Sequence, residues 1–110
     1  MYRMLTCFNL KPEATIEEFR HAVGEFTSHL QTMDLVESTG PIGRRQRHPI
    51  MDTDSERDHE YFFVMSFRDL DHCDRAVEYI QSCDESDTTE HAAMYSKIED
   101  PVFICWEDLE

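Results

Sequence analysis

Residues 61–69 read YFFVMSFRD, and this stretch decides the expected fold. Successive side chains of a β-strand point to opposite faces, so the residues of a strand divide into two sets. One set consists of Tyr61, Phe63, Met65 and Phe67. The other set contains Phe62 and Val64, which are apolar as well. A strand that is apolar on both faces must be covered on both, which predicts a central strand with packing partners on either side.

A strand and a helix are expected before this stretch. Residues 2–10, YRMLTCFNL, are rich in strand-forming residues and are followed by Pro12, which stops a β-ladder. Thr15 and Glu18 have the spacing of a capping box, in which each side chain bonds the backbone of the other. Apolar residues then recur every three or four positions as far as Met33, which predicts an amphipathic helix.

The remaining elements are predicted in the same way. Residues 35–48 are strand-like but contain Gly40, Pro41 and Gly43, so we expect a bent or bulged edge strand. Asp69 or Asp71 can cap a second helix that runs to about Ser82. A short third helix presents four residues on one face, namely His91, Met94, Tyr95 and Ile98. A last strand, PVFICWEDL, begins at Pro101.

The order of these elements predicts a ferredoxin-like βαββαβ fold of the α+β class, in one domain spanning residues 1–110. The helices of this fold cover one face of an antiparallel sheet. On the first strand one set of residues is Tyr2, Met4, Phe8 and Leu10. We expect this set and the set containing Tyr61 to point away from the helices, where a second copy covers them by sheet-to-sheet packing as a homodimer.

The charge of the chain limits its partners. Ten Lys and Arg side chains against 24 Asp and Glu give a formal net charge of −14. Such a charge repels phosphate backbones and anionic membrane surfaces, so we expect neither nucleic acid nor membrane as a partner. The start of the sequence lacks a secretory signal pattern, which favours the cytoplasm. Four widely spaced cysteines, Cys7, Cys73, Cys83 and Cys105, are expected to be buried free thiols.

Three segments resemble the dimeric α/β-barrel superfamily, which includes stress-responsive barrel proteins and the antibiotic-biosynthesis and haem-degrading monooxygenases. They are TCFNLKPEATIEEF near the start, YFFVMSF with DLDHCDRAVEYI in the middle, and HAAMYSKIEDPVFICW near the end. The resemblance implies that two sheets meet to form a barrel. It also implies a ligand cavity between each sheet and its own helices.

The resemblance also suggests site residues. In the haem-degrading members an asparagine on the first strand bonds the substrate beside a histidine and a tryptophan, so Asn9 and His91 are candidates here. Trp106 lies on the last strand and does not match that tryptophan. Tyr95, one helical turn after His91, can orient a phenol-like ligand. The enzymatic interpretation predicts a cavity of a few hundred Å³ beside Asn9. The alternative is that Asn9 closes a turn before Pro12 and His91 caps a short helix.

Three further residues are candidates for ligand binding. Cys7 shares the strand parity of Asn9, and Ser66 and Arg68 share a parity on the strand at 61–69, so we expect all three to line the same pocket. Arg68 can hold an anionic group there, or else it pairs with one of the abundant carboxylates.

No metal or cofactor is expected. Asp52, Asp54, Glu56 and Asp58 resemble a calcium loop, but the central glycine and the bidentate glutamate are missing. His72 and Cys73 are neighbours on a helix and point about 100° apart, which prevents easy chelation of one metal.

Two alternatives concern charge and element order. The RNA-recognition motif has the same order of elements, but Thr6 and Glu60 replace its stacking aromatic and its glycine. The basic residues Arg44, Arg45 and Arg47 alternate in direction along a strand, so we expect pairing with the carboxylate loop rather than an anion site. Arg45 and Arg47 are expected on one side of the strand, and Arg44, Gln46 and His48 on the other.

Two functions follow from these expectations. The first is a cofactor-independent, monooxygenase-like enzyme that acts on a small aromatic compound through Asn9, His91 and Tyr95. The second is a non-catalytic ligand-binding or stress-response dimer. A cavity in which the three side chains converge favours the enzyme, and a filled core favours the second function.

Overall fold

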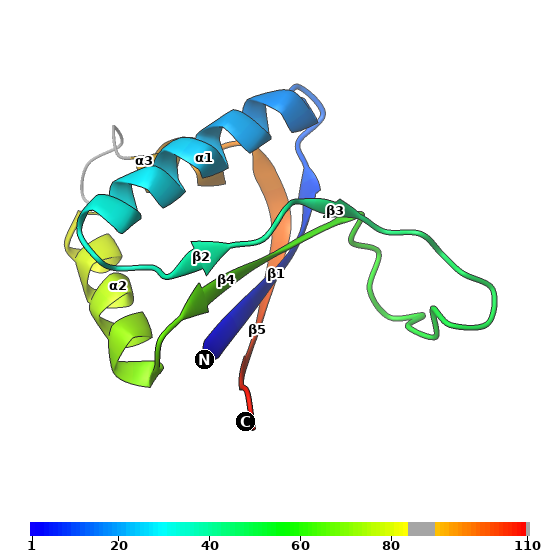
Figure 1. Ribbon diagram of the computed structural model, residues 1–110. Helices are drawn as coiled ribbons and strands as arrows, with labels where there is room; N and C mark the ends of the chain where they lie inside the picture. Colours follow the sequence, from blue (N-terminus) through cyan, green and yellow to red (C-terminus); the bar gives the residue numbers. More distant parts are fainter. Residues whose placement is uncertain (84–89, 110) are drawn as a thin grey trace.

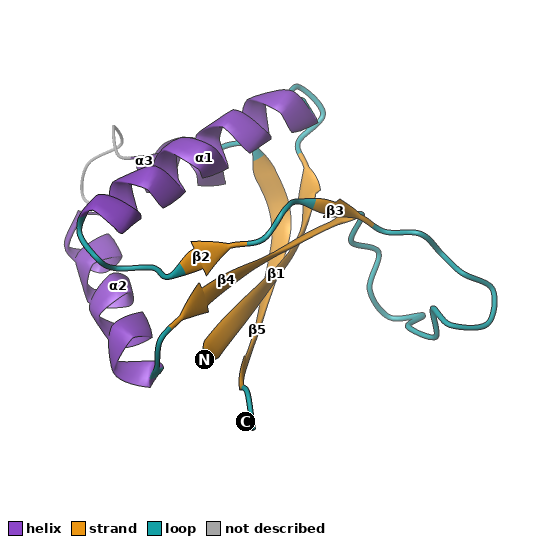
Figure 2. Ribbon diagram, viewed as in Figure 1, coloured by secondary structure: helices purple, strands orange, loops and turns teal. Residues whose placement is uncertain are grey.

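The computed structural model describes residues 1–83 and 90–109 and has the predicted α+β, ferredoxin-like architecture. The elements are β1 (Tyr2–Leu10), α1 (Ile16–Thr32), β2 (Ser38–Thr39), β3 (Gly43–Arg44), β4 (Tyr61–Phe67), α2 (Leu70–Cys83), α3 (Glu90–Tyr95) and β5 (Ile98–Glu107). An antiparallel sheet runs in the order β2-β4-β1-β5, with β3 also paired to β4. The helices form a layer on one side of this sheet (Figures 1 and 2).

The helix starts follow the predicted caps. Thr15 Oγ1 accepts a hydrogen bond from the backbone N–H of Glu18 at 3.2 Å, which confirms the capping box at the start of α1. Asp69 Oδ1 accepts from the N–H of His72 at 2.8 Å, so Asp69 rather than Asp71 caps α2.

The edge strand is interrupted as predicted, but it ends at Arg44, so residues 45–48 belong to the following loop and not to a strand. Two short strands, β2 and β3, both pair with β4, and the N–H of Gly40 donates to the carbonyl of Val64 at 2.8 Å between them. Pro41 follows directly and has no N–H to donate, which accounts for the break.

The last strand begins earlier than predicted. β5 starts at Ile98 and contains Pro101, because a bulge lies at this point. Cys7 is opposite Val102 whereas Asn9 is opposite Glu99, so β5 carries one extra residue there, and Asp100 has a φ of 55°. A bulge leaves a backbone group outside the ladder, which accommodates proline within a strand.

One prediction about the sheet is wrong. The set that contains Tyr2, Met4, Phe8 and Leu10 faces the helices, as does the set with Tyr61, Phe63, Met65 and Phe67. Phe8 is fully buried, and its ring lies 4.5 Å from that of Phe19 in α1. The pattern of a strand separates its residues into two sets but does not say which set faces the helices. The rings of Phe8 and Phe63 face α1, where Phe19 supplies an aromatic partner.

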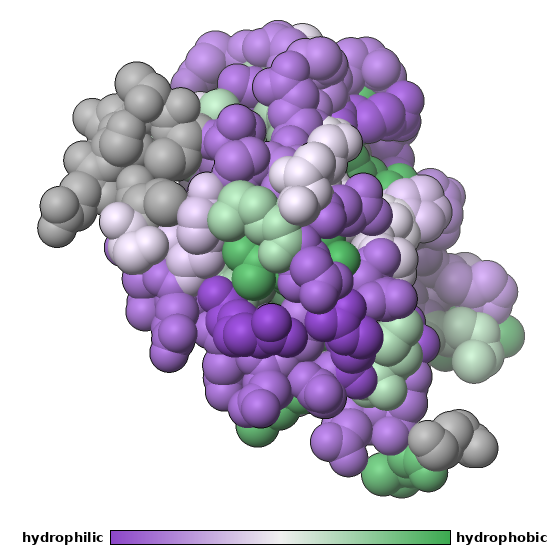
Figure 3. All heavy atoms as spheres, turned by 60° about the vertical axis from the view of Figure 1, so that its left-hand side comes forward, coloured by the Kyte–Doolittle hydropathy of each residue, from purple (hydrophilic) through white to green (hydrophobic). Residues whose placement is uncertain are grey.

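The sheet face turned away from the helices is called the outer face here. Its residues, which follow from the strand register, are Arg3, Leu5 and Cys7 in β1, Phe62, Val64 and Ser66 in β4, and Val102, Ile104 and Trp106 in β5. Ile104 and Trp106 are each 40% exposed. The helix side of the molecule, by contrast, is mostly hydrophilic, with a small hydrophobic patch (Figure 3). The sheet is therefore apolar on both faces, as predicted.

Residues 45–60 form the β3–β4 loop, which projects beyond the sheet on the side away from the helices (Figure 1). Its last part returns to the sheet at His59, which is buried and whose Nε2 lies 2.6 Å from the carbonyl oxygen of Asp100. The carbonyl at the bulge of β5 is thereby bonded to the loop.

Candidate functional site

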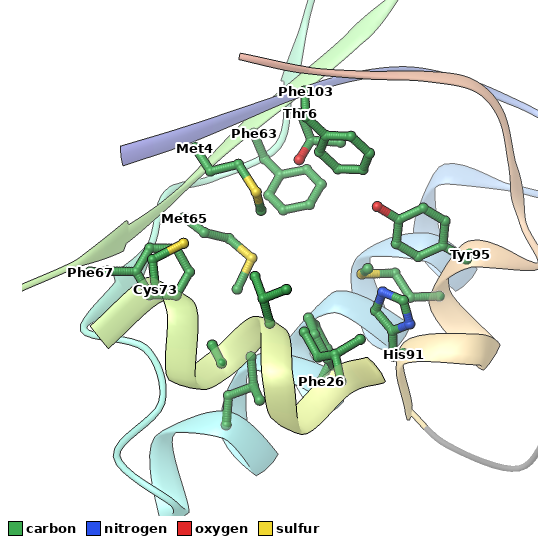
Figure 4. Close-up of a pocket in the computed structure, with 15 residues that line it drawn as sticks. Met4, Thr6, Phe26, Phe63, Met65, Phe67, Cys73, His91, Tyr95 and Phe103 are labelled. Carbon is green, nitrogen blue, oxygen red and sulfur yellow. The ribbon is translucent and has the colours of Figure 1, made fainter. Parts of the chain in front are cut away.

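A cavity of about 50 Å³ lies between the sheet and the helix layer. It is lined by Met4, Thr6, Phe26, Leu30, Phe63, Met65, Phe67, Cys73, Ala76, Val77, Ile80, His91, Met94, Tyr95 and Phe103. Three strands and three helices contribute to this lining, and most of the side chains are apolar (Figure 4). This is the place that the family resemblance implied for a ligand cavity.

Three polar side chains line one part of the cavity. The hydroxyl oxygen of Thr6 is buried and has no hydrogen-bond partner among the described residues. The hydroxyl of Tyr95 points toward Thr6 and Phe103, and the ring of His91 lies below it (Figure 4). The ring centroids of His91 and Tyr95 are 4.5 Å apart. A buried hydroxyl without a partner costs about 1–3 kcal/mol, so the position of Thr6 is unfavourable unless a bound molecule supplies that partner.

The other part of the cavity is lined by sulfur-containing side chains. Met4, Met65 and Cys73 point into it from β1, β4 and α2 (Figure 4). Burial raises the pKa of the Cys73 thiol, which favours the neutral form over the nucleophilic thiolate. Methionine side chains are unbranched and adapt to different shapes, so this end can widen around a ligand.

The cavity opens between α2 and β5. Val77 in α2 and Phe103 in β5 line it and are nevertheless 42% and 44% exposed. The enclosed space is smaller than the few hundred Å³ that we expected. A dry cavity of about 150 Å³ takes up benzene, so a single-ring ligand requires the methionines or the side chains at the opening to move.

Helix α3 places His91 and Tyr95 at this site. The two residues are one helical turn apart and therefore share a face, as the spacing predicted. Met94 between them is buried in the core, and the ring of His91 lies 5.4 Å from that of Phe26 in α1. The short helix is thus fixed by its own apolar contacts.

Asn9 is not part of this cavity. It lies on the strand set that faces away from the helices, and its Oδ1 accepts a hydrogen bond from the backbone N–H of Glu60 at 2.9 Å. The amide holds the end of the β3–β4 loop against β1. The structure therefore brings His91 and Tyr95 together, but not Asn9.

Cys7, Ser66 and Arg68 do not line the cavity either. Cys7 and Ser66 belong to the outer face, where the hydroxyl of Ser66 accepts from Arg3 Nη1 at 2.8 Å. Arg68 pairs with Asp34 at 2.7 Å and with Glu37 at 3.3 Å. Of the two alternatives for Arg68, an anionic ligand or a carboxylate of the chain, the structure has the second. The hydrogen bonds from Arg68 lower the pKa of Asp34.

The cysteines differ from one another in exposure. Cys7 and Cys73 are buried and free, as predicted. Cys105 is also free but exposed, because β5 is the edge strand of the sheet. The side chain of Cys83 lies outside the described residues.

His72 is a fully buried histidine whose burial was not anticipated. Its Nδ1 accepts from the backbone N–H of Arg68 at 3.0 Å, and its Nε2 lies 2.8 Å from the carbonyl oxygen of Asp34. Both ring nitrogens are thus bonded to backbone, which gives this residue a structural role. Among residues 1–83 and 90–109, no group of three or more His, Cys, Asp or Glu side chains is placed to hold a metal ion.

Two of the three arginines in the basic cluster, Arg45 and Arg47, lie against loop carboxylates, as expected. Arg45 binds both carboxylate oxygens of Asp52 at 2.6 and 2.7 Å, and these bonds hold the pKa of Asp52 down at about 2. Arg47 lies 3.8 Å from Asp58. The guanidinium of Arg44 lies over the ring of Tyr61, 5.6 Å from its centroid.

Two lining residues were missed at the sequence level. Thr6 is the one polar residue between Met4 and Phe8 in an apolar strand set, and this interruption was the available signal. Phe103 lines the cavity because it is paired with Thr6 across β1 and β5. Nothing in the sequence alone indicates that pairing.

The match to a sequence family decides the assignment of the chain. Residues 1–108 match the family described as "Family of unknown function (DUF6614)". The chain belongs to this family. No curated protein matches the sequence.

Solved structures resemble this DUF6614 member in fold. A protein from Arabidopsis thaliana has a TM-score of 0.75 at 5% identity, covering 100% of this chain and 97% of its own. A DABB family protein with a ferredoxin-like fold from Mesorhizobium loti has a TM-score of 0.59 at 18% identity, covering 99% and 97%. A dimeric ferredoxin-like protein of unknown function from Thermobifida fusca has a TM-score of 0.57 at 10% identity, covering 96% and 88%.

These likenesses place the DUF6614 chain among ferredoxin-like folds that include the DABB type. Sequence identities this low show a shared fold and nothing about a shared function. Among the described residues of this family member, no helix has both the length and the apolar character needed to cross a membrane.

Proposed function

We propose that the chain binds a small, mostly apolar molecule of single-ring size that carries one hydroxyl or carbonyl oxygen. The observation that carries this proposal is the buried hydroxyl of Thr6, which has no partner among the described residues and faces a cavity with otherwise mainly apolar walls. Ligand pockets typically combine such walls with a few polar groups that fix orientation. Tyr95 and His91 supply the other polar groups on the same side.

The ligand inferred from this lining is a phenol-like or ketone-like ring. Its ring packs between the methionine side chains and Phe63, while its oxygen bonds Thr6 and Tyr95. A charged ligand is disfavoured, because neither a carboxylate nor an Arg or Lys side chain lines the described cavity and an unpaired ion is costly in apolar surroundings.

The functional unit in this proposal is a homodimer formed by packing two outer faces against each other. Exposed apolar area costs about 25 cal/mol per Å², and a second copy removes Ile104 and Trp106 from water. Arg3 is the one charged residue among the nine that define the outer face, and it pairs with Asp108 at 2.8 Å. The dimeric protein from Thermobifida fusca supports this assembly.

Catalysis of the monooxygenase-like type is a second candidate. The ring centroids of His91 and Tyr95 lie 4.5 Å apart in the cavity, so that His91 can accept a proton from a hydroxylated aromatic compound while Tyr95 bonds its oxygen. Asn9 has no part in this site, so the catalytic set reduces to these two residues.

Binding is tested by titrating the protein with phenol and with toluene, monitored by calorimetry and by thermal denaturation. Wild type should prefer phenol, and Thr6→Val should lose most of that preference while still binding toluene. Thr53→Val, in the exposed loop, is the matched control and should behave as wild type. Failure of wild type to bind either compound contradicts the proposed ligand class.

Catalysis is tested separately, by oxygen uptake with hydroxylated aromatic compounds. Uptake that disappears in His91→Asn and falls in Tyr95→Phe supports the second candidate. Binding without any uptake in wild type assigns the cavity to a non-catalytic ligand-binding protein.

A further inference from the structure

The β3–β4 loop, residues 45–60, is long for a segment without helix or strand. Loops of more than about 12–15 residues without secondary structure are uncommon in compact domains and are usually functional. It projects beyond the sheet rather than lying over the helices (Figure 1). Its length and direction therefore call for an explanation that the cavity does not provide.

Hydrogen bonds hold this loop in a defined shape. The largely buried guanidinium of Arg45 binds the carboxylate of Asp52 with two nitrogens, and also donates to the carbonyls of Asp54 and Arg57 at 2.9 and 2.5 Å. His48 Nδ1 accepts from the backbone N–H groups of Ile50 and Met51 at 3.1 and 2.9 Å. The turn that carries these two apolar residues is thus fixed from within the loop.

Fixing the loop in this way leaves its apolar residues in solvent. Ile50 and Met51 are adjacent, and their exposed fractions are 76% and 75%. A loop without internal bonds could fold such side chains back onto the sheet. The Arg45 contacts hold them out instead, at a position where they contribute little to the core of their own chain.

The loop is continuous with the outer face. Cys7 of the outer face is buried, although it points away from the helices. Burial raises the pKa of its thiol, with smaller effects from the charges of Arg57, Asp54 and Arg45 in the loop. Asn9 and His59 fasten the returning end of the loop to β1 and β5. The loop therefore starts from the margin of the outer face, next to any molecule that packs on the exposed part of that face.

The arginines of the loop are paired within the loop itself. Arg45 pairs with Asp52, Arg57 pairs with Asp54 at 2.9 Å, and Arg47 lies 3.8 Å from Asp58. Apolar contact through Ile50 and Met51 is therefore the main interaction that the tip offers, and the proposed homodimer places a second copy on the adjoining outer face.

We propose that residues 45–60 form an arm that reaches across the homodimer and packs Ile50 and Met51 against the second copy. This inference rests on the proposed homodimer of outer faces. Because a twofold interface is self-complementary, each copy both gives and receives an arm. The arm adds apolar contact at the margin of the sheet-to-sheet interface.

The main test measures the dimer dissociation constant of the full chain by sedimentation velocity. Ile50→Ser with Met51→Ser should raise that constant by about tenfold or more, with an unchanged circular dichroism spectrum. Met33→Ser with Leu70→Ser is the matched control, because these residues are exposed in the helix layer, and it should change the constant less than about twofold.

A second measurement does not depend on the stability of the double variant. A photo-crosslinking benzoylphenylalanine at position 51 should give a covalent dimer on irradiation, whereas the same group at position 33 should not. A wild-type dimer with no cross-link at position 51 and an unchanged constant in the double variant overturns the arm but leaves the sheet-to-sheet dimer in place.

Three other outcomes also count against the arm. A monomeric wild type overturns the homodimer and the arm together. A cross-link confined to one chain assigns the tip to a contact within its own copy. Binding to phosphatidylcholine vesicles that disappears in the double variant assigns the tip to a lipid surface.

Discussion

The two faces of the sheet are both apolar, yet they are built for different partners. The inner face carries the bulky rings of Phe8 and Phe63, which pack on α1 and surround the cavity. The outer face carries aliphatic residues, the rings of Phe62 and Trp106, and the neutralised pair of Arg3 and Asp108. Apolar residues on both sides indicate two partners. The inner face packs on the chain's own helices, and the exposed apolar residues of the outer face are left for another molecule.

The largest effect is expected from deleting a ring on the inner face. Phe8→Ala should lower the free energy of unfolding by about 3–5 kcal/mol, because Phe8 is fully buried between the sheet and Phe19. Phe62→Ala removes the same ring from the outer face, where it is half-buried, and should have a smaller effect at concentrations where the chain is monomeric. Urea denaturation compares the two variants, and equal losses would contradict the assignment of the faces.

The next effect concerns the dimer. Ile104→Glu should weaken dimerisation by about 100-fold, or about 2.7 kcal/mol, because it places an unpaired carboxylate in the proposed interface. Leu70→Glu makes the same change at an exposed aliphatic residue of the helix layer and should leave the dimer unchanged. Light scattering over a dilution series distinguishes the two, and a wild-type dimer that survives Ile104→Glu would place the interface elsewhere.

Thr6→Val should act in the opposite direction on stability. Removing a buried hydroxyl that lacks a partner among the described residues should stabilise the unliganded protein by about 1 kcal/mol. The same change should weaken phenol binding, which separates the role of Thr6 in the cavity from any role in folding. A loss of stability in thermal denaturation would show that the hydroxyl is already bonded, for example by water.

The smallest effect is expected in the loop. Arg45 holds the pKa of Asp52 at about 2, below the ordinary value of 3.8. This contribution is fully present above about pH 4 and should be lost as the pH falls from about 4 to about 2, when Asp52 becomes protonated.

Hydrogen exchange of the loop amides follows this titration. Asp52→Asn should abolish the acid-dependent increase in exchange, whereas Asp58→Asn should retain it because Asp58 is highly exposed and lies 3.8 Å from Arg47. Loop protection that persists at pH 2 would contradict the role given to Asp52.

The elements of this fold were largely predictable from local signals. The capping box at Thr15 and the helical spacing of His91 and Tyr95 depend on residues that are close in sequence, and both are found in the structure. The interruption of the edge strand at Pro41 follows from the absence of its N–H.

The sides of the sheet and the role of Asn9 were not predictable in the same way. Strand alternation defines two residue sets but is symmetric between the faces, and long-range packing such as that of Phe8 on Phe19 breaks that symmetry. Asn9 is held by the backbone N–H of Glu60, a partner 51 positions away. The bulge at Asp100 and Pro101 likewise depends on the register between β1 and β5.

The central claim is that the outer face of the sheet is covered by a second copy of this chain. Sedimentation equilibrium of the wild-type protein at about 10 μM tests it most directly. The account predicts a mass twice the 13.0 kDa of one chain. A stable species with the mass of a single chain at that concentration would contradict it.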